Sequence, residues 1–147
     1  MRCRASSLEL AVVWSDADFQ EVVISASSPN FFGRVNLYAS PGELAQLADR
    51  LSGFPTSRYD RREFQLGQDN LFGYGTAKIS LYSSDSTGHV IFELDLKANA
   101  DTDKVAQQVE SCLVLVSGAV ADVDRLEAEL RAIDNVVGSS TVVRSAG

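Results

Sequence analysis

Apolar and polar residues alternate along much of this chain, as they do in strands that bury one face of a sheet. Residues 8–14 and 20–26 are rich in apolar and β-branched side chains, and a polar stretch separates them, so they predict a hairpin. Residues 32–39 continue the alternation as a third strand. Residues 76–82 and 89–96 predict a second hairpin, because a polar turn that contains glycine connects them.

Three further strands are predicted, at residues 63–66, 105–116 and 141–144. In the strand that begins at residue 89 the two faces differ sharply in polarity. We expect one face to be buried and the other to meet water. The residues expected to be buried are Val90, Phe92, Leu94 and Leu96, and those expected to be solvent-exposed are His89, Ile91, Glu93, Asp95 and Lys97.

Two segments change to the three-to-four-residue spacing of an amphipathic helix. Ser40, Pro41 and Glu43 are typical of a helix start, with Ser40 as the N-cap, and Gly53 ends this helix. A second helix is predicted over residues 119–133, where Glu127 and Arg131 lie one turn apart and form a favourable pair. The inner stripes are Leu44, Leu47, Ala48 and Leu51 in the first helix, and Val123, Leu126, Leu130 and Ile133 in the second.

These elements predict an α+β fold with a largely antiparallel sheet and two amphipathic helices packed on one face. The 147 residues suit a single domain, residues 1–147. The two helical stripes repeat at a constant offset of 79 residues, which suggests an internal ββαβ-type repeat with units of about 8–66 and 75–144. Chance similarity explains the offset equally well, because all amphipathic helices share such patterns.

The charge of the chain is uneven and favours a basic protein partner. Residues 1–62 carry no net charge, and residues 63–147 hold the whole net charge of −7. An acidic surface repels phosphate backbones, so nucleic-acid binding is not expected. No apolar stretch approaches the ~20 residues of a membrane helix, and residues 8–14 indicate a strand in place of a signal peptide. We expect a cytoplasmic protein that does not bind membranes, and an exposed edge strand would allow a homodimer.

Catalytic chemistry has few candidate residues here. His89 is the single histidine and follows Gly88 at a hairpin tip, and the two cysteines, Cys3 and Cys112, are far apart in sequence and are expected to be free thiols. One set of oxygen ligands has the spacing of a calcium loop, but Lys104 stands where that loop needs glycine, so a solvated turn is the better interpretation. That set is Asn99, Asp101, Asp103 and Glu110. The sequence therefore predicts no enzyme activity, no cofactor and no metal.

Two groups of charged residues are candidates for binding a partner. The first is a basic cluster with one aromatic residue, which could bind a carboxylate or a phosphate, or could be a solvated loop paired with Asp60 and Glu63. The second is the acidic side of the second helix, which would meet a basic partner. The basic cluster is Arg58, Tyr59, Arg61 and Arg62, and the acidic group is Asp122, Asp124, Glu127 and Glu129.

The order of elements over residues 8–133 resembles small bacterial proteins of the wall-associated-protein immunity (WapI-like) type. The segments that carry the resemblance are residues 32–35, 40–44, 54–55 and 85–90. The resemblance implies an antitoxin-like protein that binds and blocks a toxin domain without chemistry of its own. It brings no catalytic residues to this chain.

A second, local resemblance leads to an alternative function. Residues 112–118, followed by Asp124, Arg125 and Leu126, are similar to the ligand-sensing ferredoxin-like module of nickel-responsive repressors. The histidine ligands and the DNA-binding segment of those repressors are missing. The alternative is a small-molecule-sensing module, with a pocket between sheet and helices and residues 58–62 at its mouth.

Overall fold

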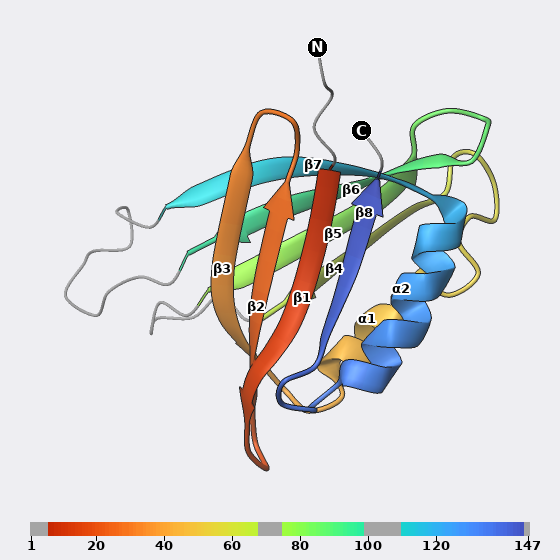
Figure 1. Cartoon of the computed structure of the whole chain (residues 1–147). Helices are drawn as coiled ribbons and strands as arrows, with labels where there is room; N and C mark the ends of the chain where they lie inside the picture. The colour runs from red at the N-terminus through yellow and green to blue at the C-terminus, as the bar shows by residue number, and fades with distance from the viewer. Residues whose placement is uncertain (1–5, 68–74, 99–109, 146–147) are drawn as a thin grey trace.

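The computed structural model describes residues 6–67, 75–98 and 110–145, which form two antiparallel sheets and two helices (Figure 1). The α+β class with antiparallel sheets is therefore confirmed. The strands are β1 (Ser6–Ser15), β2 (Gln20–Ser27), β3 (Phe32–Ala39), β4 (Arg61–Leu66), β5 (Thr76–Ser83), β6 (His89–Lys97), β7 (Ser111–Ala119) and β8 (Ser140–Ser145), and the helices are α1 (Glu43–Leu51) and α2 (Val120–Ile133).

Each half of the chain contributes its last strand to the sheet of the other half: β4 joins the sheet of β5–β7, and β8 joins the sheet of β1–β3. The first sheet has the order β3-β2-β1-β8, and the second has the order β4-β5-β6-β7. Each sheet therefore combines three consecutive strands from one half of the chain with one strand from the other half. The internal repeat stays a prediction, and in this structure neither half forms a four-stranded sheet from its own strands alone.

The hydrophobic core lies between the sheets, where the inward residues of both meet. Leu10 on β1 and Phe92 on β6 are fully buried, and the four apolar residues of β6 that were predicted to be buried are so. The residues between them on β6 are partly or fully exposed, as the alternation predicted. No helix of the described segments is long and apolar enough to cross a membrane.

The two helices pack against each other along one side of the sheets, where α1 contacts β4 and α2 contacts β8 (Figure 1). They run antiparallel: the Leu44 amide near the start of α1 donates to Asp134 Oδ1 at 3.2 Å, just after the end of α2. Near the end of α1, Asp49 Oδ1 lies 2.7 Å from Arg131 Nη1. Both predicted apolar stripes are buried between the helices and the core.

Three predicted boundaries differ from the structure. The strand predicted at residues 105–116 continues to Ala119, and its residues 105–109 lie outside the described segments. Gly42 is the N-cap of α1 in place of Ser40, and its φ of 92° is open to glycine far more readily than to other residues. The Ser40 amide still donates to Glu43 Oε1 at 3.4 Å, while Glu43 Oε2 accepts a bond from the Gly67 amide at 3.0 Å, so this carboxylate joins the helix start to the end of β4. Strand β4 begins at Arg61, two residues earlier than predicted.

The buried side-chain amide of Gln20, at the start of β2, connects this strand to the segment before α1 and to the segment after α2. Its nitrogen donates to the Ser40 carbonyl at 3.0 Å and to Asp134 Oδ1 at 2.8 Å, and its oxygen accepts from the Asn135 amide at 2.8 Å. These bonds tie β2 to the approach of α1 and to the end of α2.

Some predictions concern residues outside the described segments. Cys3 lies there, as do three of the four oxygen ligands of the calcium-like spacing, which are Asn99, Asp101 and Asp103.

Candidate protein-binding surface

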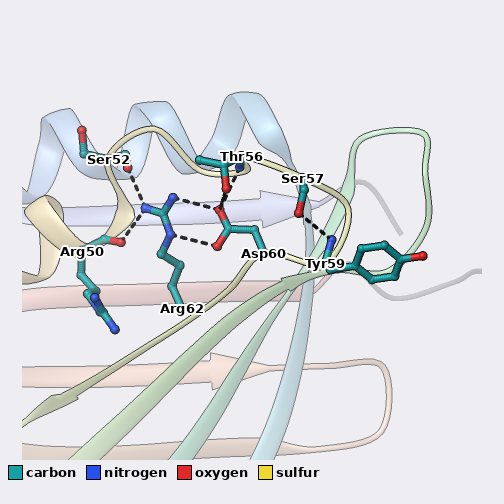
Figure 2. A network of polar contacts seen from close by, with 7 residues as sticks. All are labelled: Arg50, Ser52, Thr56, Ser57, Tyr59, Asp60 and Arg62. Atoms are coloured by element: carbon teal, nitrogen blue, oxygen red, sulfur yellow. Dashed lines mark hydrogen bonds and ion pairs between the residues drawn. The ribbon is translucent and has the colours of Figure 1, made fainter.

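Arg62 anchors the loop of residues 52–60, which connects α1 to β4 (Figure 2). Its guanidinium forms a two-point contact with the Asp60 carboxylate, with Nη2 2.9 Å from Oδ2 and Nε 3.1 Å from Oδ1. Only 17% of the Arg62 side chain and 10% of the Asp60 side chain are exposed. The hydrogen bond from Arg62 is the main reason that the pKa of Asp60 lies below its ordinary value.

The same guanidinium also donates hydrogen bonds to carbonyl groups at the C-terminal end of α1. Its Nη1 donates to the Arg50 carbonyl at 3.0 Å and to the Ser52 carbonyl at 2.6 Å, two groups that the helix itself leaves without a partner. The cation lies 5.6 Å from the centroid of the Phe54 ring. Arg62 therefore acts as a structural link between the helix end, the loop and β4.

Further hydrogen bonds within the loop fix its course (Figure 2). Asp60 Oδ2 accepts from the Thr56 amide at 2.8 Å and from the Thr56 hydroxyl at 3.1 Å. The Ser57 hydroxyl accepts from the Tyr59 amide at 3.2 Å, and the Ser57 carbonyl accepts from the Asp60 amide at 3.1 Å. The loop is thus held in one shape by its own polar groups.

This framework displays Arg58 and Tyr59 to solvent. Tyr59 is 81% exposed, and Figure 2 shows its ring pointing away from the polar network. The Arg58 guanidinium lies 5.2 Å from the centroid of the Tyr59 ring, within the range of a cation–π contact. An exposed arginine and tyrosine on a rigid loop have the composition of a binding hot spot.

The four residues of the predicted basic cluster do not act together. Arg61 and Arg62 are neighbours on β4, so the pleat of the strand sends their side chains to opposite faces. Arg61 lies on the outer face of the second sheet, 4.8 Å from the centroid of the Tyr82 ring, 3.4 Å from Glu63 and 3.7 Å from Glu93. Arg58 and Tyr59 remain as the part that a partner can reach.

The acids predicted on α2 are divided in a similar way. Asp122 accepts from the Ala119 amide at 2.8 Å and lies 3.2 Å from Arg125, so it serves the start of the helix. The predicted pair of Glu127 with Arg131 is confirmed at 3.2 Å, and Glu129 accepts a bond from the Thr141 hydroxyl. Asp124 is exposed, and within the described segments it has neither an ion pair nor a side-chain hydrogen bond.

The fold brings the loop and the beginning of α2 to one end of the molecule. The loop that follows α1 lies at the N-terminal end of α2 (Figure 1). The turn of residues 84–88 reaches the same end, where the Val120 amide donates to the Gly88 carbonyl at 3.1 Å. We name Arg58, Tyr59 and Asp124 at this end the tip surface.

The single histidine lies near this end but forms no catalytic relay. His89 Nδ1 is 2.7 Å from Asp85 Oδ2 and 3.0 Å from the Thr87 hydroxyl, so the carboxylate and the hydroxyl share one ring nitrogen. A nucleophile and an orienting carboxylate need opposite nitrogens of the ring. Hydrogen bonds from Thr87, and then from His89, hold the pKa of Asp85 far below its ordinary value, which stabilises the turn.

A small cavity of about 230 Å³ lies at a different place, between β3 and the β6–β7 end of the second sheet. Arg34 and Cys112 line it, together with Phe32, but the loop of residues 52–60 does not. Partial burial, and then the charge of Asp95, raise the pKa of the Cys112 thiol, so this sulfur is not activated as a nucleophile. Among the described residues no three His, Cys, Asp or Glu side chains gather as metal ligands.

Comparisons with known proteins found no similar family, protein or structure. No protein family matches the chain, and neither a curated protein nor a solved structure matches it. The chemistry of the described surface is therefore the basis for the function proposed below.

Proposed function

We propose that this chain is a non-enzymatic binding protein that uses the tip surface to bind and block a basic domain of another protein, as an immunity-type inhibitor does. The observation that carries the proposal is the display of Arg58 and Tyr59 on a loop that is already ordered by its own hydrogen bonds. Tyrosine and arginine dominate the binding energy of many protein interfaces.

The rigidity of the loop supports a binding role. Ordering a flexible loop during association costs part of the binding energy, so a loop that is ordered beforehand retains more affinity. Arg62 and Asp60 supply that order, and most of both side chains is buried.

The charge of the chain supports a basic partner. The net charge of −7 comes from residues 63–147, and Asp124 on the tip surface has no internal ion pair within the described segments. Complementary charge raises the association rate and contributes less to the final contact energy. A basic toxin domain would therefore be attracted to the chain, Asp124 would contribute to this attraction at the tip surface, and Tyr59 would provide the contact area.

The first test concerns Tyr59. We expect Tyr59→Ala to weaken binding of the partner roughly tenfold or more, without a change in thermal stability, because the side chain is almost fully exposed. The partner would be isolated from a lysate of the source organism, identified by mass spectrometry, and titrated calorimetrically against both proteins.

Phe19→Ala is the matched control, because Phe19 is an exposed aromatic residue on the β1–β2 turn, away from the tip surface. Equal affinities of wild type and Tyr59→Ala would contradict the proposed surface. Growth of cells that produce the partner alone and the partner with this protein would test inhibition: a partner that is harmless when alone would contradict the immunity function.

The second test concerns the charge of Asp124. We expect Asp124→Lys to slow association with the basic partner at low salt, and the difference from wild type to shrink at high salt because ions screen exposed charges. Stopped-flow association rates at several salt concentrations would measure this. Asp18→Lys, an exposed acid on the β1–β2 turn, is the matched control. A salt dependence that is the same for both variants would show that the tip surface does not attract the partner.

A further inference from the structure

Strand β7 forms an edge of the second sheet and differs from the other edge strands. Its nine residues, Ser111–Ala119, include no charged residue and no proline. On its outer face Leu113 is 56% exposed and Leu115 is 45% exposed. An unpaired strand of this kind can accept another strand through its free backbone groups.

The other three edges carry charges that oppose such pairing. Strand β4 has Arg61, Arg62 and Glu63, β3 has Arg34, and β8 has Arg144. Charged side chains on an edge are a common means by which proteins prevent strands from adding to their sheets. Among the edge strands of the described segments, β7 is the one that carries no charge to oppose pairing.

We propose that β7 pairs with β7 of a second copy of this chain, antiparallel across a twofold axis at Leu115, to form a continuous eight-stranded sheet. In this register Leu115 faces its own copy, and Leu113 faces Ser117 of the partner copy. A twofold interface must be complementary to itself, and an uncharged strand with leucine at its centre meets this requirement. Cross-strand contact removes the exposed leucines from water.

The acids on the outer face of the second sheet do not oppose this pairing. The nearest acids on the outer face are Glu93 and Asp95 of β6, and Glu93 already lies 3.7 Å from Arg61. In the paired sheet the two β6 strands are three strand spacings apart, about 14 Å. This separation exceeds the Debye length of roughly 8 Å at physiological salt, so the acids of the two copies are screened from each other.

Analytical ultracentrifugation of the purified chain tests this proposal, and needs no partner protein. We expect the wild type to sediment as a dimer at high micromolar concentration, and Leu115→Lys to raise the dissociation constant at least about tenfold, because two like charges would face each other across the axis. Leu115→Glu should have the same effect. An equimolar mixture of the two variants should dimerise again, because lysine would then face glutamate.

Two controls separate this interface from others. Mixing Leu113→Lys with Leu113→Glu should give the same dissociation constant as either variant alone, because residue 113 faces Ser117 of the other copy and opposite charges would not meet. Val137→Lys, at an exposed apolar residue of the α2–β8 loop, should leave the dimer unchanged. A monomeric wild type, or a dimer that survives Leu115→Lys, would overturn the proposal. These results do not depend on whether the tip surface binds a toxin, so the two proposals can fail separately.

Discussion

Replacing Arg62 by methionine is expected to lower the free energy of unfolding by about 2–3 kcal/mol at pH 7, because the change leaves the largely buried Asp60 carboxylate without its cation. It also removes the donor for the Arg50 and Ser52 carbonyls at the end of α1. Methionine keeps much of the apolar volume of the arginine stem, so the loss would be mainly electrostatic. Urea denaturation measures the difference.

Arg61→Met is the matched control for this prediction. Arg61 is the next residue on the same strand, but 46% of its side chain is exposed and its ion pairs lie on the surface. Exposed ion pairs contribute about 0–1 kcal/mol, so this variant should be nearly as stable as the wild type. Equal losses for the two variants would contradict the structural role assigned to Arg62.

The effect of Arg62→Met should depend on pH in a defined direction. The pKa of Asp60 is lower in the folded protein than in the unfolded chain, so the stability that it contributes is fully present above the ordinary aspartate pKa of about 4. That stability is lost as the pH falls through the lowered pKa, because both states then bind the proton. The difference between wild type and variant should therefore shrink below about pH 4, and a constant difference would contradict the ion pair.

Replacing Gly33 by alanine is expected to lower the free energy of unfolding by about 2–3 kcal/mol. A Cβ on Gly33 would overlap the Cys112 sulfur and would lie 3.2 Å from Leu96 Cδ1. Gly33 faces inward on β3, so the added methyl group cannot turn to solvent. Either the Cys112 side chain must rotate away from the new methyl group or β3 and β7 must move apart, and the loss should appear as a lower midpoint in urea denaturation.

A double-mutant cycle tests the cause of this loss. Cys112→Ala removes the sulfur that the new methyl group would meet, so Gly33→Ala should cost much less in the Cys112→Ala background. The contact with Leu96 should leave a small residual cost. The same loss in both backgrounds would show that the space beside Cys112 does not determine the choice of glycine.

Much of the secondary structure could be predicted from local pattern. The alternation in residues 89–96 predicted which side chains of β6 are buried, and the stripe from Val123 to Ile133 predicted the buried face of α2. Each pattern depends only on residues within one strand or helix, so it can be detected in a single sequence. The start of α1 was misplaced, because Gly42 with its positive φ took the N-cap position that a serine usually occupies.

The candidate surface was predicted only in part. The sequence predicts a cluster from Arg58 to Arg62, but the earlier start of β4 places Arg61 and Arg62 on opposite faces. The acids of α2 were noticed as a group, but three of them serve internal contacts and Asp124 is left. A count of charges in the sequence cannot distinguish a charged side chain that forms contacts within the fold from one that is exposed and available to a partner.

The sequence by itself determined the α+β class, the hairpins, the two amphipathic helices and the place of the negative charge. The tertiary structure alone decided that the halves exchange β4 and β8, that Gly33 meets Cys112, and that the loop after α1 lies beside the start of α2. The reason is physical: periodicity is a property of neighbours in the chain. Pairing between sheets, and the buried contacts of Arg62 and Asp60, arise between segments that meet only when the chain folds.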